Sequence, residues 1–307
     1  MAEITTRPTV ARPQVNFWQN KKFQDRAITI GATILCIIGV IIILFPVAWM
    51  LSTALKTRAE VARFPPTWIP ADPQWINFRD ALFSTENPFP TYFKNTMFYA
   101  LMAMIGETLS CAFIAYGFAR LRAPGKDILF LLVLATMMLP WQVTLIPQYV
   151  MFVKLDRMHF LGLDWINSYA PLIVPKFFGS SYLIFMLRQF YRGLPKDYEE
   201  AAIMDGANYL NIWARIILPL SKPALGAVAI LSFMYHYNDF MGPLLYINDN
   251  AKYPVSLGLQ QFRAPFGGTA WHLLMAASLV TVLPPVIVFF VAQRYFIQGI
   301  VISGVKG

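Results

Sequence analysis

The sequence contains long stretches in which apolar residues follow one another without a charged side chain, and these stretches constrain the fold more than any motif. The first of them runs from Ala27 to Leu55 and holds no Asp, Glu, Lys or Arg. A helix needs about 20 apolar residues to cross the hydrocarbon core of a bilayer. Only 13% of the residues are charged, against roughly 25% in soluble domains. The sequence therefore predicts an all-α integral membrane protein.

Six blocks are long and apolar enough to be transmembrane helices. Glu107 interrupts the second block and Lys176 interrupts the fourth. We interpret the first block as an uncleaved membrane anchor. The predicted spans are Ala27–Leu51, Asn95–Ala119, Ile128–Val153, Trp165–Leu187, Ile216–Asn238 and His272–Gln293.

The Lys and Arg residues indicate the orientation of these spans. Their dense clusters fall on one side of the predicted membrane, which the positive-inside rule assigns to the cytoplasm together with both termini. The domains are then a cytoplasmic segment 1–26, a transmembrane domain 27–299 with an external loop 52–94, and a cytoplasmic tail 300–307. The net charge of +9 is spread over the ends of the spans and forms no single basic patch, so we expect no nucleic-acid binding.

A polar loop, residues 195–219, lies between the fourth and fifth predicted spans. Pro195 suits a first helical turn, and the acidic residues that follow are favoured near a helix N-terminus. Ala201 and Ala202 give a small-residue face that a partner can approach closely, and Gly206 permits a sharp bend. These features alone predict a short helix and a bend, which many surface helices share.

The spacing of residues in this loop is more specific. It consists of Glu200-Ala201-Ala202, Gly206 after three residues, Ile216 after nine more, and then Leu218-Pro219. The spacing resembles the EAA signature of ATP-binding-cassette (ABC) importer permeases. Other segments resemble the carbohydrate permeases of the maltose-transport type, in particular the second permease subunit. Those segments are Tyr116–Arg122, Pro140–Pro147, Gln293–Gly299 and Gly304–Gly307.

The resemblance implies the type I ABC importer permease fold, in which this loop docks on an ATPase and passes its closure to the membrane helices. The residues that it implies for coupling are Glu200, Ala201, Ala202, Asp205, Gly206, Ala207, Leu218 and Pro219. The implied partners are a second, different permease, two ATPases and an extracytoplasmic solute-binding protein, in the plasma (inner) membrane of a bacterium or archaeon. The chain has no GxxxxGK[ST] phosphate loop, so we expect ATP and Mg²⁺ on the partner ATPase and no cofactor in this chain.

A second motif, His236-Tyr237-Asn238-Asp239, lies near the expected outer end of the fifth span. It resembles the aromatic-Asn-acid-Phe motif of the same family, with Tyr237 where Trp is usual, and the resemblance implies that it lines the translocation path. Aromatic faces, amides and carboxylates suit a sugar. The alternative, that Asn238 and Asp239 only cap a helix end in water, stays open. Gln142 in the third span either lines the path or bonds a neighbouring helix.

Two single charges within the spans, Glu107 and Lys176, either pair across the bundle or face a water-filled cavity. Because a phosphorylated solute needs clustered positive charge, the lone Lys176 favours a neutral mono- or oligosaccharide. A permease for another polar solute, such as glycerol phosphate, remains the alternative. The resemblance further implies alternating access driven by the partner ATPases.

Two further function classes fit less well. An ion-coupled secondary transporter would show internal repeats, and we find none. An intramembrane enzyme would need a nucleophile with a base, a carboxylate pair or a metal set. The separated residues His159, His236 and His272 do not supply one, so we predict neither catalytic nor metal-binding residues.

Overall fold

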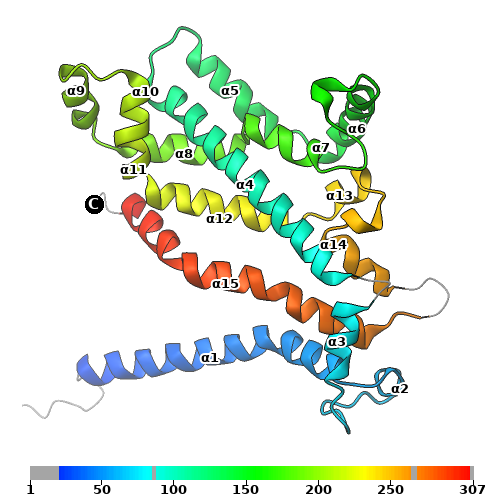
Figure 1. Cartoon of the computed structure of the whole chain (residues 1–307). Helices are drawn as coiled ribbons and strands as arrows, with labels where there is room; N and C mark the ends of the chain where they lie inside the picture. The colour runs from blue at the N-terminus through cyan, green and yellow to red at the C-terminus, as the bar shows by residue number, and fades with distance from the viewer. Residues whose placement is uncertain (1–20, 85–87, 264–267, 305–307) are drawn as a thin grey trace, which may run out of the picture.

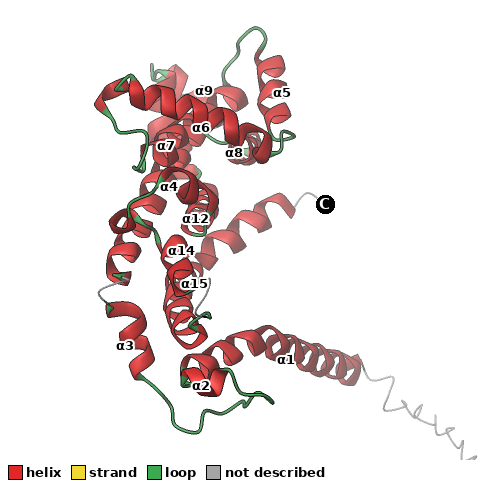
Figure 2. Ribbon diagram, turned by 90° about the vertical axis from the view of Figure 1, so that its right-hand side faces the viewer, coloured by secondary structure: helices red, strands yellow, loops and turns green. Residues whose placement is uncertain are grey.

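The computed structural model describes residues 21–84, 88–263 and 268–304. The predicted segment 1–26 therefore lies mostly outside the described residues, as do the last three residues of the tail 300–307. Within the described ranges the regular elements are α-, 3₁₀- and π-helices, together with an isolated bridge between Phe83 and Pro88. The prediction of an all-α protein is confirmed for this part of the chain (Figure 2).

The helices differ widely in length, from single turns to 34 residues (Figure 1). The α-helices are α1 Lys21–Ala54, α2 Arg58–Val61, α3 Ile76–Phe83, α4 Phe89–Arg120, α5 Lys126–Thr136, α6 Trp141–Arg157, α7 Ala170–Ile173, α8 Ser181–Gly193, α9 Asp197–Met204, α10 Tyr209–Ile212, α11 Leu218–Leu220, α12 Lys222–Tyr237, α13 Met241–Tyr246, α14 Val255–Gly258 and α15 Trp271–Gly304. The remaining turns are η2 Phe160–Gly162, η3 Val174–Phe178, the π-helical η4 Trp213–Ile217, η5 Asn250–Lys252 and η6 Leu259–Phe262.

Among the described residues, 4 helical stretches are long and apolar enough to cross a membrane, or up to 6 if each of two bent pairs is one span. The four stretches are Gln24–Ala54, Phe89–Arg120, Ala170–Gly193 and Trp271–Gln293. The bent pairs are α5 with α6, at 97°, and Tyr209–Leu220 with α12, at 80°. Hydropathy therefore located the apolar segments, but two of them are not straight helices.

The bend between α5 and α6 falls within the predicted span Ile128–Val153, which is therefore not one continuous helix. Pro140 follows the end of α5 and begins the new direction. Proline has no N–H to donate and disfavours the helical conformation of the residue before it, here Leu139. The sequence is apolar on both sides of the bend, so hydropathy alone could not reveal it.

The bend before α12 follows a π-helical turn. The N–H of Leu218 bonds the carbonyl of Trp213, five residues back, and Pro219 supplies no N–H at the next position. The chain then breaks at Ser221 before α12 begins at Lys222. The predicted start of the fifth span, Ile216, therefore lies before the bend, in the shorter helical stretch of this pair.

Helix α4 occupies the centre of the fold and packs against α8 and α12. Its buried face carries a column of small side chains, and Ala100, Ala103, Ala112 and Ala115 are all 0% exposed. Small residues allow neighbouring helix backbones to approach closely, which is how helices associate in a bilayer. By contrast, the apolar window of α1 is 0% buried, and α1 packs mainly along α15.

The described residues of the predicted external loop 52–94 form a cap at one end of the helices. The Asn77 amide donates to the carbonyls of Ala54 at 2.8 Å and Lys56 at 2.9 Å. The Lys56 ammonium, 4.6 Å from the Trp49 ring centroid, donates to the Thr67 carbonyl. In Figure 1 this cap, with α2 and α3, lies at the opposite end of the helices from α9, the start of α1 and the end of α15.

Candidate functional site

The predicted coupling loop 195–219 contains α9, α10, η4 and the first residues of α11. Helix α9 has three acidic residues in its first turn, where the helix dipole favours them. Its other end turns at Gly206, whose φ is +79°. Gly206 N–H donates to the Ile203 carbonyl at 3.0 Å, and Ala207 N–H donates to the Ala202 carbonyl at 2.9 Å. This is a Schellman ending, which favours glycine at that position.

Helix α9 has one face packed on its own chain and one face exposed. Ala202 is 8% exposed and belongs to the core that α4, α8 and α12 share. Glu200 and Ala201 are exposed, and so are two apolar residues, Ile203 at 48% and Met204 at 87%. Of the two alanines expected on a docking face, Ala201 is exposed and Ala202 is buried against its own chain.

The remaining residues expected at the coupling loop divide in the same way. Asp205, Gly206 and Pro219 are exposed, whereas Ala207 and Leu218 are half-buried and pack on the same core as Ala202. Ile203 and Met204 were missed in the sequence. Their position in the helix is the signal that could have found them. Ala202 of α9 faces the core, so the residues that directly follow it point away from the core.

A buried arginine fixes α9 to the end of α4. The guanidinium of Arg120 donates to the carbonyls of Tyr191 at 2.5 Å and Leu194 at 2.6 Å. Its Nε lies 3.1 Å from Glu199 Oε1, and the two side chains are 4% and 13% exposed. Burial raises the pKa of the Glu199 carboxyl, while Arg120 and Lys196 act to lower that pKa. The ion pair therefore offsets only part of the desolvation of Glu199.

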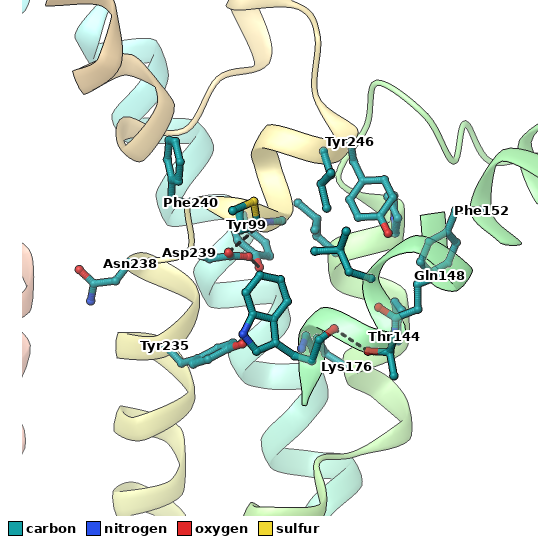
Figure 3. Close-up of a pocket in the computed structure, with 18 residues that line it drawn as sticks. Tyr99, Thr144, Gln148, Phe152, Lys176, Tyr235, Asn238, Asp239, Phe240 and Tyr246 are labelled. Atoms are coloured by element: carbon teal, nitrogen blue, oxygen red, sulfur yellow. Dashed lines mark hydrogen bonds between the residues drawn. The ribbon is translucent and has the colours of Figure 1, made fainter. Parts of the chain in front are cut away.

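A second candidate site is a cavity of about 660 Å³ between α4, α6, η3, α12 and α13. Figure 3 shows side chains from these elements pointing into it. Its aromatic lining residues are Tyr99, Trp141, Phe152, Tyr235, Phe240 and Tyr246, and its polar ones are Thr144, Gln148, Lys176, Asn238 and Asp239. Aromatic faces beside hydroxyl, amide and charged groups can stack on a sugar ring and bond its hydroxyls.

The carboxylate of Asp239 is held in place on the wall of this cavity. Tyr99 hydroxyl donates to Asp239 Oδ2 at 2.7 Å, and Gly242 N–H donates to Oδ1 at 3.1 Å. Asp239 is therefore more than a helix cap in open water. Asn238 also lines the cavity, with its amide donating to the Met234 carbonyl at 2.7 Å, and in Figure 3 its side chain projects away from Asp239.

The other residues expected on the substrate path do not line this cavity. His236 is 1% exposed, and Tyr237 is 4% exposed with its hydroxyl donating to the Thr281 carbonyl at 2.8 Å. Gln142 is exposed on a different face of α6 from Trp141, Thr144 and Gln148, which do line the cavity. Helical geometry explains both results, since residues three or four apart share a face and adjacent residues do not.

A buried polar cluster joins α4 to α12 behind the cavity. Glu107 Oε2 accepts from Ser232 Oγ at 2.5 Å and lies 3.1 Å from His236 Nε2. His236 Nδ1 lies 3.3 Å from the Tyr99 hydroxyl, which in turn bonds Asp239. The possibility that Glu107 pairs with Lys176 is not what the structure shows. Lys176 Nζ instead lies 5.7 Å from the centroid of the Tyr235 ring at the cavity.

The sequence offered one usable signal for the missed cavity residues. Tyr235 lies three and four residues before Asn238 and Asp239, so it shares their helix face. Tyr99 comes from α4, and its contact with Asp239 spans 140 positions of sequence. No local pattern predicts such a contact, because it depends on how α4 and α12 pack.

Known proteins are similar to this chain over most of its length. Residues 109–302 match the family described as "Binding-protein-dependent transport system inner membrane component". The chain is 33% identical to the arabinooligosaccharides transport system permease protein AraQ of Bacillus subtilis, over 86% of this chain and 91% of that protein. It is 31% identical to the sn-glycerol-3-phosphate transport system permease protein UgpE of Pectobacterium atrosepticum, over 91% of this chain and 98% of that protein.

A solved structure has a similar fold. It is described as the crystal structure of a bacterial ABC transporter involved in the import of the acidic polysaccharide alginate. The TM-score is 0.75 at 22% identity, covering 89% of this chain and 98% of that chain. The family match covers more than half of the chain and both candidate sites, apart from Tyr99. The chain therefore belongs to the family of binding-protein-dependent transport system inner membrane components.

Proposed function

We propose that this chain is a membrane-spanning permease subunit of an ABC importer, and that it carries a neutral mono- or oligosaccharide by alternating access. It would work beside a second permease, with two ATPases that bind ATP and Mg²⁺ and a solute-binding protein that delivers the sugar. The proposed location is the bacterial inner membrane. Counting each bent pair as one span gives six spans, so both termini lie on the same side of the membrane. The positive-inside rule assigns that side to the cytoplasm.

The observation that carries the proposal is the division of α9 into a packed and an exposed face. Glu199 and Ala202 attach the helix to its own chain, while Glu200, Ala201 and Met204 remain accessible. An apolar side chain that is 87% exposed next to a carboxylate is a suitable surface for a protein partner. Helix α9 lies at the same end of the fold as the start of α1 and the end of α15 (Figure 1). We assign this end to the cytoplasm.

The charges around the cavity favour a neutral solute. Lys176 and Asp239 lie on its wall, and a further carboxylate, Glu107, lies behind it against His236. Among the described residues of the wall, one cation stands beside one carboxylate, whereas a phosphate group is usually recognised by convergent Arg or Lys. Six aromatic side chains on the wall provide faces on which sugar rings stack.

A permease for a phosphorylated solute is the second candidate. It is favoured by the similarity to UgpE, a glycerol-3-phosphate permease by its description, and by the position of Lys176 on the cavity wall. Its substrate would need further positive charge from the second permease.

The test is to purify the chain with the proteins that accompany it and to reconstitute the complex in proteoliposomes. We expect a second permease and an ATPase to co-purify with the chain. With added binding protein, we expect neutral oligosaccharides to stimulate ATP hydrolysis and glycerol 3-phosphate not to stimulate it. Stimulation by glycerol 3-phosphate alone would select the second candidate. A chain that purifies alone and transports with an ion gradient would overturn the proposal in favour of a secondary transporter.

Gly242→Ala should impair transport by displacing the Asp239 carboxylate. A Cβ atom at position 242 would lie 2.5 Å from Asp239 Oδ2 and 2.9 Å from Leu172 Cδ2, so one of these groups has to move. We expect a several-fold lower rate of sugar uptake at an unchanged amount of assembled complex. Gly117→Ala is the matched control, because a Cβ there meets nothing within 4 Å. Equal uptake by both variants would show that the position of this carboxylate is unimportant.

A further inference from the structure

Arg120 joins three elements at one end of the bundle. It is the last residue of α4, it bonds the carbonyls of Tyr191 and Leu194 at the end of α8, and it pairs with Glu199 in the first turn of α9. The last carbonyls of a helix have no partner within the helix. A planar guanidinium can donate to two carbonyls and at the same time form an ion pair with a carboxylate, whereas a lysine ammonium acts as a point charge.

The other contacts of α4 extend from this end to the cavity. Helix α4 has 32 residues and is therefore about 48 Å long. Two of its turns hold polar side chains that bond other parts of the chain. Glu107 bonds Ser232 and His236 of α12, and Tyr99 bonds Asp239 just after the end of α12. One continuous helix therefore connects the Arg120–Glu199 pair at its end with the polar contacts beside the cavity.

We propose that Arg120 and Glu199 form the link through which movement of α9 is transmitted to α4, and through α4 to Asp239 in the cavity. Both are positioning residues, and neither contacts the solute. The inference rests on the proposed coupling role of α9, but it assigns a separate step. Glu200 and Met204 would hold the ATPase, whereas Glu199 and Arg120 would convert its movement into a change at the cavity.

The experiment uses the complete importer in proteoliposomes and compares Glu199→Ala and Arg120→Lys with the parent. We expect the ATPase to co-purify in an unchanged ratio, and the number of solute molecules transported per ATP to fall on the order of tenfold, within the usual range of coupling between sites. Arg122→Ala is the matched control, since Arg122 is an exposed charge two residues after Arg120. We expect parental transport per ATP in this control.

A second readout separates transmission from a merely structural role. Asn238→Cys places a thiol at the cavity, in a background that carries Cys36→Ala and retains the buried Cys111. Labelling by a membrane-impermeant maleimide is measured with the binding protein present, with and without a non-hydrolysable ATP analogue. The analogue should change the labelling rate in the parent and in Arg122→Ala, and should leave it unchanged in Glu199→Ala.

Three results would overturn the proposal. The first is parental transport per ATP in Glu199→Ala. The second is a change of labelling with the ATP analogue in Glu199→Ala that is as large as in the parent. The third is loss of the ATPase from the purified Glu199→Ala complex, which would place Glu199 in the docking face itself. If Arg120→Lys does not assemble, Glu199→Ala decides alone. A different variant tests the proposed docking of α9 on the ATPase. That docking role would be wrong if Glu200→Lys left both ATPase binding and uptake intact.

Discussion

Gly206→Pro should abolish sugar uptake by the assembled importer while leaving the subunit inserted in the membrane. Gly206 has a φ of +79°, and proline is restricted to about −65°. The substitution also removes the N–H that bonds the Ile203 carbonyl at 3.0 Å. The end of α9 then has to take another course, and the exposed face from Glu200 to Met204 loses its orientation. Uptake into proteoliposomes and binding-protein-stimulated ATP hydrolysis measure the effect.

Gly206→Ala is the graded control for this prediction. A Cβ at this position meets nothing within 4 Å, so the only cost is the left-handed backbone, about 1–2 kcal/mol for a residue other than glycine. We expect partial uptake with alanine and none with proline. Parental uptake and parental stimulation of ATP hydrolysis in Gly206→Pro would show that the geometry of α9 has no part in transport.

Asp239→Ala should reduce sugar uptake more than any other single change at the cavity. It removes a carboxylate that bonds Tyr99 and Gly242 and lies on the wall. Hydrogen bonds to charged groups contribute about 1.5–3 kcal/mol, so we expect uptake at low solute concentration to fall about tenfold or more. The ATPase should still co-purify, because α9 lies at the far end of the helices (Figure 1).

Two variants test whether this effect belongs to the cavity. Gln142→Ala changes a residue of α6 that does not line it, and Tyr237→Phe removes a hydroxyl that bonds the Thr281 carbonyl away from it. We expect uptake in both to stay close to that of the parent. Strong loss with Gln142→Ala and none with Asp239→Ala would place the translocation path on the other face of α6.

The sequence predicted the family, and the match over residues 109–302 confirms it. This was possible because the EAA spacing is local: Glu200, Gly206 and Pro219 lie within one loop, and their order is read without knowing the fold. The residue roles taken from the same resemblance stay predictions. The structure adds that Ala202 faces its own core and that Met204 is exposed, which divides one motif into two surfaces.

The bends were the part of the fold that hydropathy could not supply. An apolar block shows that a segment prefers lipid, but it gives no direction to the helix inside that block. Pro140 and Pro219 are visible in the sequence, yet Pro284 and Pro285 lie inside α15, which continues through them. Whether a proline ends a helix depends on the neighbours that satisfy the freed carbonyl groups, and those neighbours are tertiary.

By itself the sequence determined the all-helical membrane class, the position of most apolar segments and the loop on which the coupling proposal rests. These properties follow from composition and from spacing along one chain. Only the tertiary structure decided which polar residues meet: Glu107 with His236, Tyr99 with Asp239, and Arg120 with Glu199. Each of these pairs joins α4 to a residue far away in the sequence. The partner of a buried charge is fixed by how α4 packs against the rest of the chain, since a charge within the bundle is stable only where that packing supplies a partner.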